Sequence, residues 1–378
     1  MTRAGRQVTH PEMSIQHGTD SYPIPPTIKP MLAKLADKMP AKGDFLFEPK
    51  WDGFRAIVFR GASDVFIQSR DEKPLDRYFP ELHDACLELL PEGCVVDGEI
   101  IIRTTQGLDF DTLQMRLHPA ASRVEKLSVE TPASFVGFDV LAVGGRDCMA
   151  DPQQVRRERL EELLAGVPPP IYITPVTRDR ATAEVWFKQF EGAGLDGVIV
   201  KPVDLPYQPG KRVMVKVKHV RTADCVVGGF RWYKNTDDAV GSLLLGLYDD
   251  NGVLQHVGVT SSFTMDKRKQ LAKDLAPLRE NALEDHPWRG EAGGDDENRT
   301  PGAQSRWSSG KDLSWEPLRV ERVCEVKYDH MQGDRFRHAA RFLRWRPDKQ
   351  PQACRYDQLE EVRSYELDEI FLSGSSGP

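Results

Sequence analysis

The sequence predicts an α+β domain with mixed antiparallel sheets and helices, followed by a small β-barrel of the OB type. Two observations support this division. Between residues 26 and 220, short runs rich in Val, Ile and Phe alternate with segments of helical spacing, which is typical of a mixed domain. Between residues 221 and 352, strand-like runs follow one another with a single helix, and about five strands with one helix indicate an OB barrel.

The elements of the first domain follow from local patterns. Apolar, β-branched and aromatic runs predict strands at residues 45–47, 54–59, 65–68, 95–103, 135–141 and 197–201. Apolar residues three and four positions apart predict helices at residues 79–90, 151–164 and 181–192. The first 25 residues are polar and end in a cluster of prolines, so we expect a disordered extension there.

The barrel is predicted from strands at residues 223–232, 242–249, 253–260, 319–330 and 340–345, with a helix at residues 265–278. A polar stretch at residues 285–311 separates this helix from the fourth strand. We interpret it as a disordered segment or a substrate-binding loop. Residues 353–378 are interpreted as a C-terminal tail, and the junction near residues 218–222 as a hinge.

Composition excludes several classes of protein. The chain has 378 residues, enough for two or three domains, and no apolar run of about 18 residues that would predict a membrane span. The six cysteines include no CxxC pair, so neither a zinc ribbon nor a disulfide framework is indicated. Unpaired thiols fit a reducing cytosol.

The net charge of −7 is unusual for a nucleic-acid-binding protein, but the distribution is uneven. Residues 201–234 hold eight Lys or Arg against two Asp, and residues 335–349 form a second basic run. These runs predict either phosphate-binding surfaces or ordinary solvated surface.

Lys50 lies in the sequence Lys-Trp-Asp-Gly, where a predicted strand leads into a turn at Gly53. A lysine is a nucleophile only when its amine is neutral, and its ordinary pKa is about 10.4. Burial or neighbouring cations must therefore lower it, and a cationic neighbourhood also suits a triphosphate. An isolated pattern of this kind also fits a surface lysine before a turn.

Two carboxylates and two lysines follow on predicted strands. Glu99 and Asp196 both lie next to apolar runs, and two such carboxylates could position a hard cation such as Mg²⁺. Lys216 and Lys218 alternate with valines, so both point to one face of a strand and repel each other unless an anion lies beside them. The alternatives are a solvent-facing glutamate and an edge strand protected by lysine.

Seven short motifs occur in one order along the chain: Lys50-Trp-Asp-Gly53, Ser69-Arg70, Asp97-Gly-Glu-Ile100, Phe138-Asp139, Asp196-Gly-Val-Ile-Val-Lys201, Lys216-Val-Lys218 and Arg346-Pro-Asp-Lys349. In this order they resemble the motifs of the ATP-dependent DNA ligases of the covalent nucleotidyltransferase superfamily. The segments at residues 30–33, 305–307, 328–330 and 341–345 resemble small bacterial ligases of the ligase C type in particular. The resemblance implies a nucleotidyltransferase (adenylation) domain followed by an OB-fold domain.

It also implies roles for individual residues. Lys50 would be the nucleophile that forms AMP-lysine, Asp52 would orient it, and Lys216 and Lys218 would act on the α-phosphate. The residues implied in ATP binding are Glu48, Arg55, Arg70, Glu99, Phe138, Ile199, Lys201, Arg346, Asp348 and Lys349. Glu99 and Asp196 would meet Mg²⁺, for which Mn²⁺ could substitute. The chain departs from the commonest pattern at Asp196, where the family has Glu, and at Met214, where it has Trp.

The implied activity is the sealing of 5′-phosphate/3′-OH nicks in double-stranded DNA through lysyl-AMP and adenylated DNA, in repair or recombination. We expect a monomer in the bacterial cytosol and nucleoid, with nicked DNA as its partner and no membrane association. The alternatives are an RNA ligase, an RNA-capping guanylyltransferase, and a catalytically silent nucleic-acid-binding protein.

Overall fold

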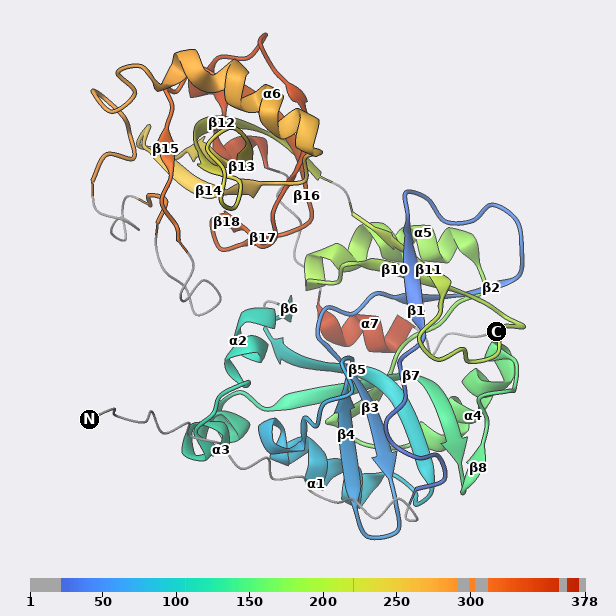
Figure 1. The fold of residues 1–378 in the computed structure, drawn as a ribbon. Helices are drawn as coiled ribbons and strands as arrows, with labels where there is room; N and C mark the ends of the chain where they lie inside the picture. Colours follow the sequence, from blue (N-terminus) through green and yellow to red (C-terminus); the bar gives the residue numbers. More distant parts are fainter. Residues whose placement is uncertain are drawn as a thin grey trace, which may run out of the picture. The chain divides into compact units, whose positions relative to one another are not determined.

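The computed structural model describes residues 22–105, 107–219, 221–290, 299–302, 312–359 and 366–373. The chain divides into two compact units, coloured along the sequence in Figure 1. The first unit comprises Met1–Lys218 and Val362–Pro378, and the second, the barrel unit, comprises His219–Glu361. The barrel unit is therefore inserted between two segments of the first unit.

The first unit is built on two sheets. One has the strand order β1 (Leu32–Ala36), β11 (Arg212–Lys218), β10 (Gly197–Pro202) and β2 (Phe45–Pro49), in which only β1 and β11 are parallel. The other has the order β4 (Val65–Ser69), β3 (Phe54–Arg60), β5 (Cys94–Thr104), β7 (Ala133–Val143) and β8 (Arg146–Asp147). The short strands β6 (Gly107–Leu108) and β9 (Ile171–Ile173) pair with β5 and β7.

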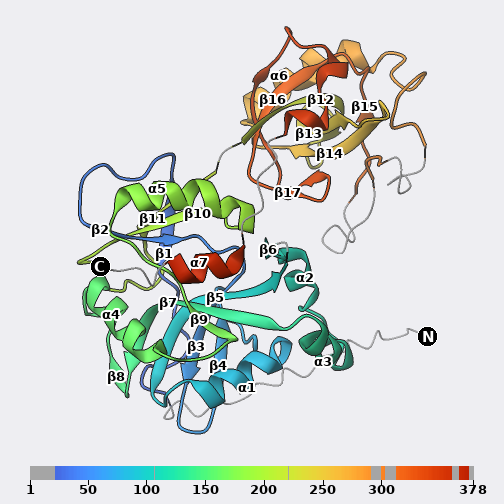
Figure 2. The same cartoon turned by 180° about the vertical axis from the view of Figure 1, so that it is seen from behind.

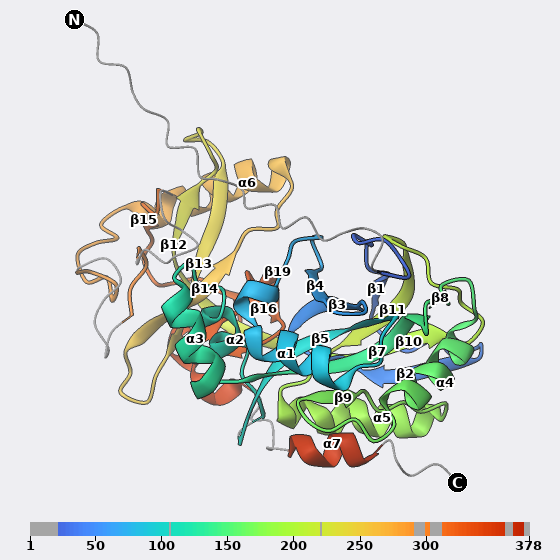
Figure 3. The same ribbon diagram turned by 90° about the horizontal axis from the view of Figure 1, so that it is seen from below.

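Six helices of this unit lie within the described residues: α1 (Pro80–Leu89), α2 (Phe110–Met115), α3 (Ala121–Glu130), α4 (Gln153–Leu164), α5 (Arg180–Gln189) and α7 (Leu367–Ser373). Leu82 and Cys86 of α1 and Leu160 of α4 are buried in one core with the apolar residues of β3, β5 and β7. Helices α5 and α7 lie next to each other in Figures 1, 2 and 3, and their apolar side chains share a second core.

The barrel unit has the strand order β14 (Leu254–Thr260), β13 (Val240–Tyr248), β12 (Arg221–Trp232), β16 (Val323–Tyr328) and β19 (Arg341–Trp345). Ala340, next to β19, makes a parallel bridge to Thr260, and its amide donates to the carbonyl of Val259 at 2.8 Å. This bridge joins the two outer strands and closes the barrel. Helix α6 (Met265–Leu275) lies between the third and fourth strands in sequence, so the predicted OB topology is confirmed.

Three short strands complete the barrel unit. Strand β15 (Glu316–Pro317) pairs with β12, and β17 (Met331–Gln332) pairs with β18 (Arg335–Phe336) in a small hairpin. Among the described residues, no helix combines the length and hydropathy needed to cross a bilayer.

The chain ends differ from the sequence-based expectation. Residues 1–21 of the predicted extension lie outside the described residues, but Tyr22 and Ile24 are buried in the core of the first unit, where their apolar surface leaves water. The predicted tail is also partly folded. Cys354 is buried in the barrel core, whereas Leu367 and Ile370 of α7 are buried in the first unit.

The predicted polar loop at residues 285–311 is only partly within view, because residues 291–298 and 303–311 lie outside the described residues. At its start the prediction is wrong. Trp288 is buried in the barrel core and donates its indole N–H to the carbonyl of Leu254 at 2.7 Å. A buried tryptophan with a satisfied N–H anchors this segment to the barrel.

Candidate active site

Lys50 directly follows the end of β2, and Asp196 directly precedes the start of β10. The two residues lie next to each other because these strands are paired. The Lys50 amide donates to the carbonyl of Gly197 at 2.8 Å, and the Asp196 amide donates to the carbonyl of Lys50 at 3.0 Å. These two backbone bonds extend the β2–β10 ladder past its last paired residues. They fix the backbone positions from which both side chains extend. Lys50 Nζ lies 2.6 Å from Asp196 Oδ2.

Asp196 binds a second lysine at the same oxygen. Lys218 Nζ lies 2.5 Å from Asp196 Oδ2, and the carboxylate side chain is only 4% exposed. Gly197 makes this approach possible: it has φ +133°, and a Cβ there would lie 2.0 Å from the carbonyl oxygen of Val217. The shorter Asp side chain therefore reaches two lysines within a closely packed strand pair.

Lys216 adds a third ammonium group to this cluster. Its burial, together with the positive charges of Lys218 and Lys50, lowers the pKa of the Lys216 amine. Three lysines around one buried carboxylate leave an excess of positive charge, which is the condition for binding a polyanion. The structure thus brings together Lys50, Asp196, Lys216 and Lys218, which the sequence analysis selected from separate segments.

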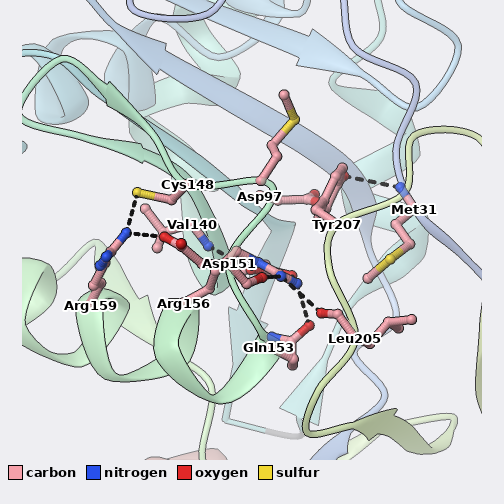
Figure 4. A network of polar contacts seen from close by, with 12 residues as sticks. Met31, Asp97, Val140, Cys148, Asp151, Gln153, Arg156, Arg159, Leu205 and Tyr207 are labelled. Carbon is pink, nitrogen blue, oxygen red and sulfur yellow. Dashed lines mark hydrogen bonds and ion pairs between the residues drawn. The ribbon is translucent and has the colours of Figure 1, made fainter.

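Arg55 is fixed by a carboxylate for which the sequence analysis gave no role. Asp97 is fully buried and accepts two bonds from Arg55, at 2.6 and 2.7 Å. The Tyr207 hydroxyl donates to Asp97 at 2.6 Å and accepts the Met31 amide at 3.0 Å. Figure 4 shows Asp97, Tyr207 and Met31 side by side. The signal that could have found Asp97 is its position two residues before Glu99 on one strand, hence on the same face.

Two cations lie close to the Phe138 ring. The Arg55 guanidinium carbon is 4.3 Å from the ring centroid and Lys201 Nζ is 5.0 Å from it. Lys201 also donates to the carbonyl of Phe138 at 2.8 Å and to both oxygens of Glu48, at 3.0 and 2.8 Å. Burial raises the pKa of Glu48, and Lys201 partly offsets that effect. Ile199 stands between Glu48 and Lys216 in the strand register.

A buried ion pair supports the strand that carries Phe138. Arg156 of α4 donates to both oxygens of Asp139, at 2.8 and 3.0 Å, and these contacts lower the pKa of Asp139 against the effect of burial. Arg156 also donates to Gln153 and to the backbone carbonyls of Asp151 and Leu205, as Figure 4 shows. The network joins β7, α4 and the segment after β10.

Glu99 lies beside the turn that carries Lys50. It is half-buried, and a Cβ added to Gly53 would lie 2.9 Å from Glu99 Cγ and 2.1 Å from the Ile100 carbonyl. Burial, with a smaller contribution from the half-buried Asp52, raises the pKa of Glu99 to about 7 against the lowering effects of Arg55 and Lys50. A cation bound there would favour the charged carboxylate, so Glu99 fits the predicted Mg²⁺ ligand.

Asp196 is less suited to binding Mg²⁺ directly, because its carboxylate charge is already neutralised by Lys50 and Lys218. Within the described residues, no group of three or more His, Cys, Asp or Glu side chains could hold a metal ion. One free carboxylate with water and substrate phosphates is nevertheless a usual arrangement for Mg²⁺.

Arg70 is exposed at the end of β4, beside a cavity of about 1000 Å³. The cavity extends from Gly53 of the Lys50 turn to Arg70. Its charged lining consists of four cations and two aspartates, Arg55, Arg70, Lys73, Arg77, Asp71 and Asp76. The positive charge of Arg70 also contributes to the lowered pKa of Lys216.

The remaining predicted residues form a cluster within the barrel unit. Arg346 donates to both oxygens of Asp224, at 2.8 and 2.9 Å, and Lys349 Nζ lies 3.1 Å from the same carboxylate. Asp348 accepts from Arg346 at 2.9 Å, and that contact lowers the pKa of Asp348 to about 2. Asp224 joins the Arg and Lys of this motif and was missed, because it lies 122 residues earlier in the chain.

Comparisons with known proteins agree with this geometry. A family profile described as the ATP dependent DNA ligase domain matches residues 30–218, half of the chain, and one described as the ATP dependent DNA ligase C terminal region matches residues 236–349. DNA ligase C2 of Mycolicibacterium smegmatis is 53% identical over 89% of this chain and 96% of its own. DNA ligase C of Mycobacterium tuberculosis is 52% identical over 92% of this chain and 98% of its own.

The chain belongs to the ATP-dependent DNA ligases. It is of the bacterial ligase C type, and the predicted enzyme class and co-substrate ATP are confirmed. The fold agrees as well. A solved Lig E DNA ligase structure is 16% identical, with a TM-score of 0.53 over 85% of this chain and all of its own. Within the ligase, the first matched region lies in the first unit and the second lies in the barrel unit.

Proposed function

We propose that Lys50 is the amine that attacks the α-phosphate of ATP and that the resulting lysyl-AMP serves to seal nicks in duplex DNA. The observation that carries this proposal is the cluster of Lys50, Lys216 and Lys218 around Asp196. A lysine held in a fixed position beside two other ammonium groups meets both needs of the step, a positioned nucleophile and compensation for phosphate charge.

The first step forms one N–P bond, breaks one P–O bond and removes two protons from the Lys50 nitrogen. The Lys50 ammonium group must first give one proton to a base so that its nitrogen can bond to the α-phosphorus. Pyrophosphate leaves with the electrons of its P–O bond, and the second proton passes from the new phosphoramide nitrogen to water. Asp196 Oδ2, at 2.6 Å, is the base nearest to that amine in the described structure. Asp52 lies in the turn two residues later and would orient the amine through the turn.

The nucleotide would be held by residues already near one another. Phe138 and Ile199 would flank the adenine, with Glu48 and Lys201 at its edge, and Arg55 and Glu99 would meet the ribose. Arg70 would contact the nucleotide or the 5′-phosphate of DNA. Arg346, Asp348 and Lys349 would orient the β- and γ-phosphates during this first step.

We further propose Mg²⁺, with Mn²⁺ as a substitute, held by Glu99 and, through water, by Asp196. The ion would neutralise phosphate charge and favour the attack on phosphorus. The raised pKa of Glu99 supports this assignment, because a carboxylate in that setting gains from a bound cation.

In the second step AMP would pass to the 5′-phosphate of a nick, and in the third the 3′-OH would displace AMP. The ligase would act as a monomer in the bacterial cytosol and nucleoid, in repair or recombination of DNA. A relative from Mycobacterium tuberculosis, 31% identical over 66% of this chain, is named a multifunctional non-homologous end joining DNA repair protein, LigD, which supports a repair role.

The experiment is incubation of the purified chain with Mg²⁺ and α-labelled ATP or GTP, followed by detection of label on denatured protein. We expect label from ATP alone, its loss in Lys50→Ala, and its discharge by nicked DNA. Label from GTP would favour capping chemistry, discharge by nicked RNA alone would favour an RNA ligase, and DNA binding without label would favour a silent binding protein.

A further inference from the structure

Helix α7 packs a phenylalanine against the residue that follows the proposed nucleophile. Phe371 stacks on Trp51, with ring centroids 5.1 Å apart and planes 15° apart. It also stacks on Tyr172 of β9, at 4.4 Å and 23°. The Phe371 ring thus contacts two aromatic side chains of the first unit, one of them adjacent to Lys50.

The helix is held in this position by more than one contact. Leu367 and Ile370 are buried among Trp186, Phe190 and Leu195. Asp368 pairs with Arg103, which also donates to the Tyr172 hydroxyl. The positions 367, 370 and 371 lie on one face of a helix, so the apolar contact with the first unit is continuous.

Trp51 is also held in place by burial and by a hydrogen bond. It is 4% exposed, and its indole N–H donates to Thr174 at 2.8 Å. Lys50 is fixed on the other side by its backbone bonds to Gly197 and Asp196. The stack of Phe371 on the indole therefore supplies a further constraint on the turn that aims the Lys50 amine.

We propose that Phe371 is a positioning residue for Lys50, which acts by holding Trp51 and with it the turn of the nucleophile. This inference rests on the proposed role of Lys50. It makes adenylation in the first unit dependent on a helix that the chain forms only after the whole barrel unit. Within the described part of the chain, Phe371 contacts Trp51 and Tyr172, whereas Glu48, Phe138 and Lys201 contact one another. Phe371 should therefore affect the rate of attack rather than ATP binding.

The test is single-turnover adenylation of the full chain with α-labelled ATP, at a temperature below the unfolding transition of every variant. For Phe371→Ala we expect a maximal rate at least about fivefold lower, because small misalignments of a reacting group are costly. The ATP concentration at half-maximal rate should stay within about twofold of the wild type, because the binding residues are untouched.

Two variants separate positioning from general stability. Phe371→Tyr keeps the stacked ring and should restore the rate. Glu369→Ala changes an exposed residue of the same helix and should behave as the wild type. An unchanged rate in Phe371→Ala, or an equal loss of rate in Glu369→Ala, would overturn the inference. In either case the label would still depend on Lys50, so the proposed nucleophile would stand. Label that survives Lys50→Ala would instead overturn the proposed nucleophile, and this inference with it.

Discussion

Asp97 and Glu99 lie two residues apart on β5, yet their surroundings differ. Asp97 is fully buried and accepts bonds from Arg55 and from the Tyr207 hydroxyl. Glu99 is half-buried beside the Lys50 turn, where burial raises its pKa to about 7. The first carboxylate is therefore suited to fixing an arginine, and the second to gaining or losing a charge near neutral pH.

This difference predicts a pH-dependent effect of Glu99→Gln on stability. A folded-state pKa near 7, above the ordinary 4.5, means that Glu99 favours the folded state below pH 4.5 and that this contribution is lost as pH rises through 7. Glutamine has no such loss. Relative to the wild type, Glu99→Gln should gain about 2 kcal/mol of unfolding free energy between pH 5.5 and pH 8. Urea unfolding without metal ions measures it.

Glu92→Gln is the matched control, because Glu92 is exposed in the segment that precedes the same strand. It should change the unfolding free energy equally at both pH values. A Glu99→Gln difference that is the same at pH 5.5 and pH 8 would contradict the prediction.

At this scale the sequence indicated the candidate site residues more readily than their partners. Lys50, Asp196 and Lys218 were identified from separate motifs, and they meet through Asp196 in the structure. Tyr207 and Asp224 were missed. Each contacts a site residue more than 100 positions away, and no local pattern indicates such a contact.

At the scale of elements, β2 and β10 carry the site between them. Their ladder aligns Glu48 with Ile199, and its extension aligns Lys50 with Gly197. The side chains of Glu48 and Lys201 meet across the same pair, each 3% exposed. A buried pair of this kind joins two strands that are 153 residues apart in sequence.

This pair predicts a strong coupling in a double-mutant cycle. Lys201→Met alone leaves the Glu48 carboxylate buried without its cation and should cost about 3 kcal/mol of unfolding free energy. Glu48→Gln/Lys201→Met removes both charges and should recover most of that loss, so the coupling energy should be about 2 kcal/mol. Chemical denaturation of the four proteins measures it.

Lys126 and Glu130 form the control cycle, because they are an exposed pair on α3 with side chains 68% and 54% exposed. Their coupling should be about 0.3–0.5 kcal/mol. Equal coupling in the two cycles would mean that burial adds nothing to the Glu48–Lys201 pair.

Elements with strong periodicity were predicted close to their observed limits. The helices predicted at 79–90 and 151–164 correspond to α1 and α4, and the five barrel strands are all present. The short helices α2 and α7, the ten-residue helix α3 and the edge strand β1 were not predicted. Their sequences mix polar and apolar residues, and tertiary contacts such as those of Leu113 and Ile370 decide their structure.

At the scale of the whole molecule, charge is distributed unevenly. The net charge is −7, but the outer strand β19 of the barrel exposes Arg341 and Arg344. Leu343 between them is 43% exposed. Arg344 is paired with Glu325 at 2.6 Å. A strand that exposes two arginines suits the phosphate backbone of DNA, which a protein can bind without reading bases.

If β19 contacts DNA phosphates, Arg341→Ala should reduce the salt dependence of nicked-DNA binding. Each lost phosphate contact lowers the slope of log K against log salt by about 0.9, because one fewer counterion is released. We expect that change in slope together with weaker binding at low salt. Fluorescence anisotropy with a nicked duplex, at several salt concentrations and without divalent metal ions, measures both quantities.

Lys273→Ala removes an equal charge from an exposed position on α6 of the same unit, so it controls for net charge. It should leave the slope unchanged, since long-range attraction is screened beyond about 10 Å at 0.1 M salt. If both variants lower the slope equally, binding depends on the overall charge of the barrel unit and β19 is not the contact. If Arg341→Ala alone lowers it, the acidic chain binds DNA through a local basic strand.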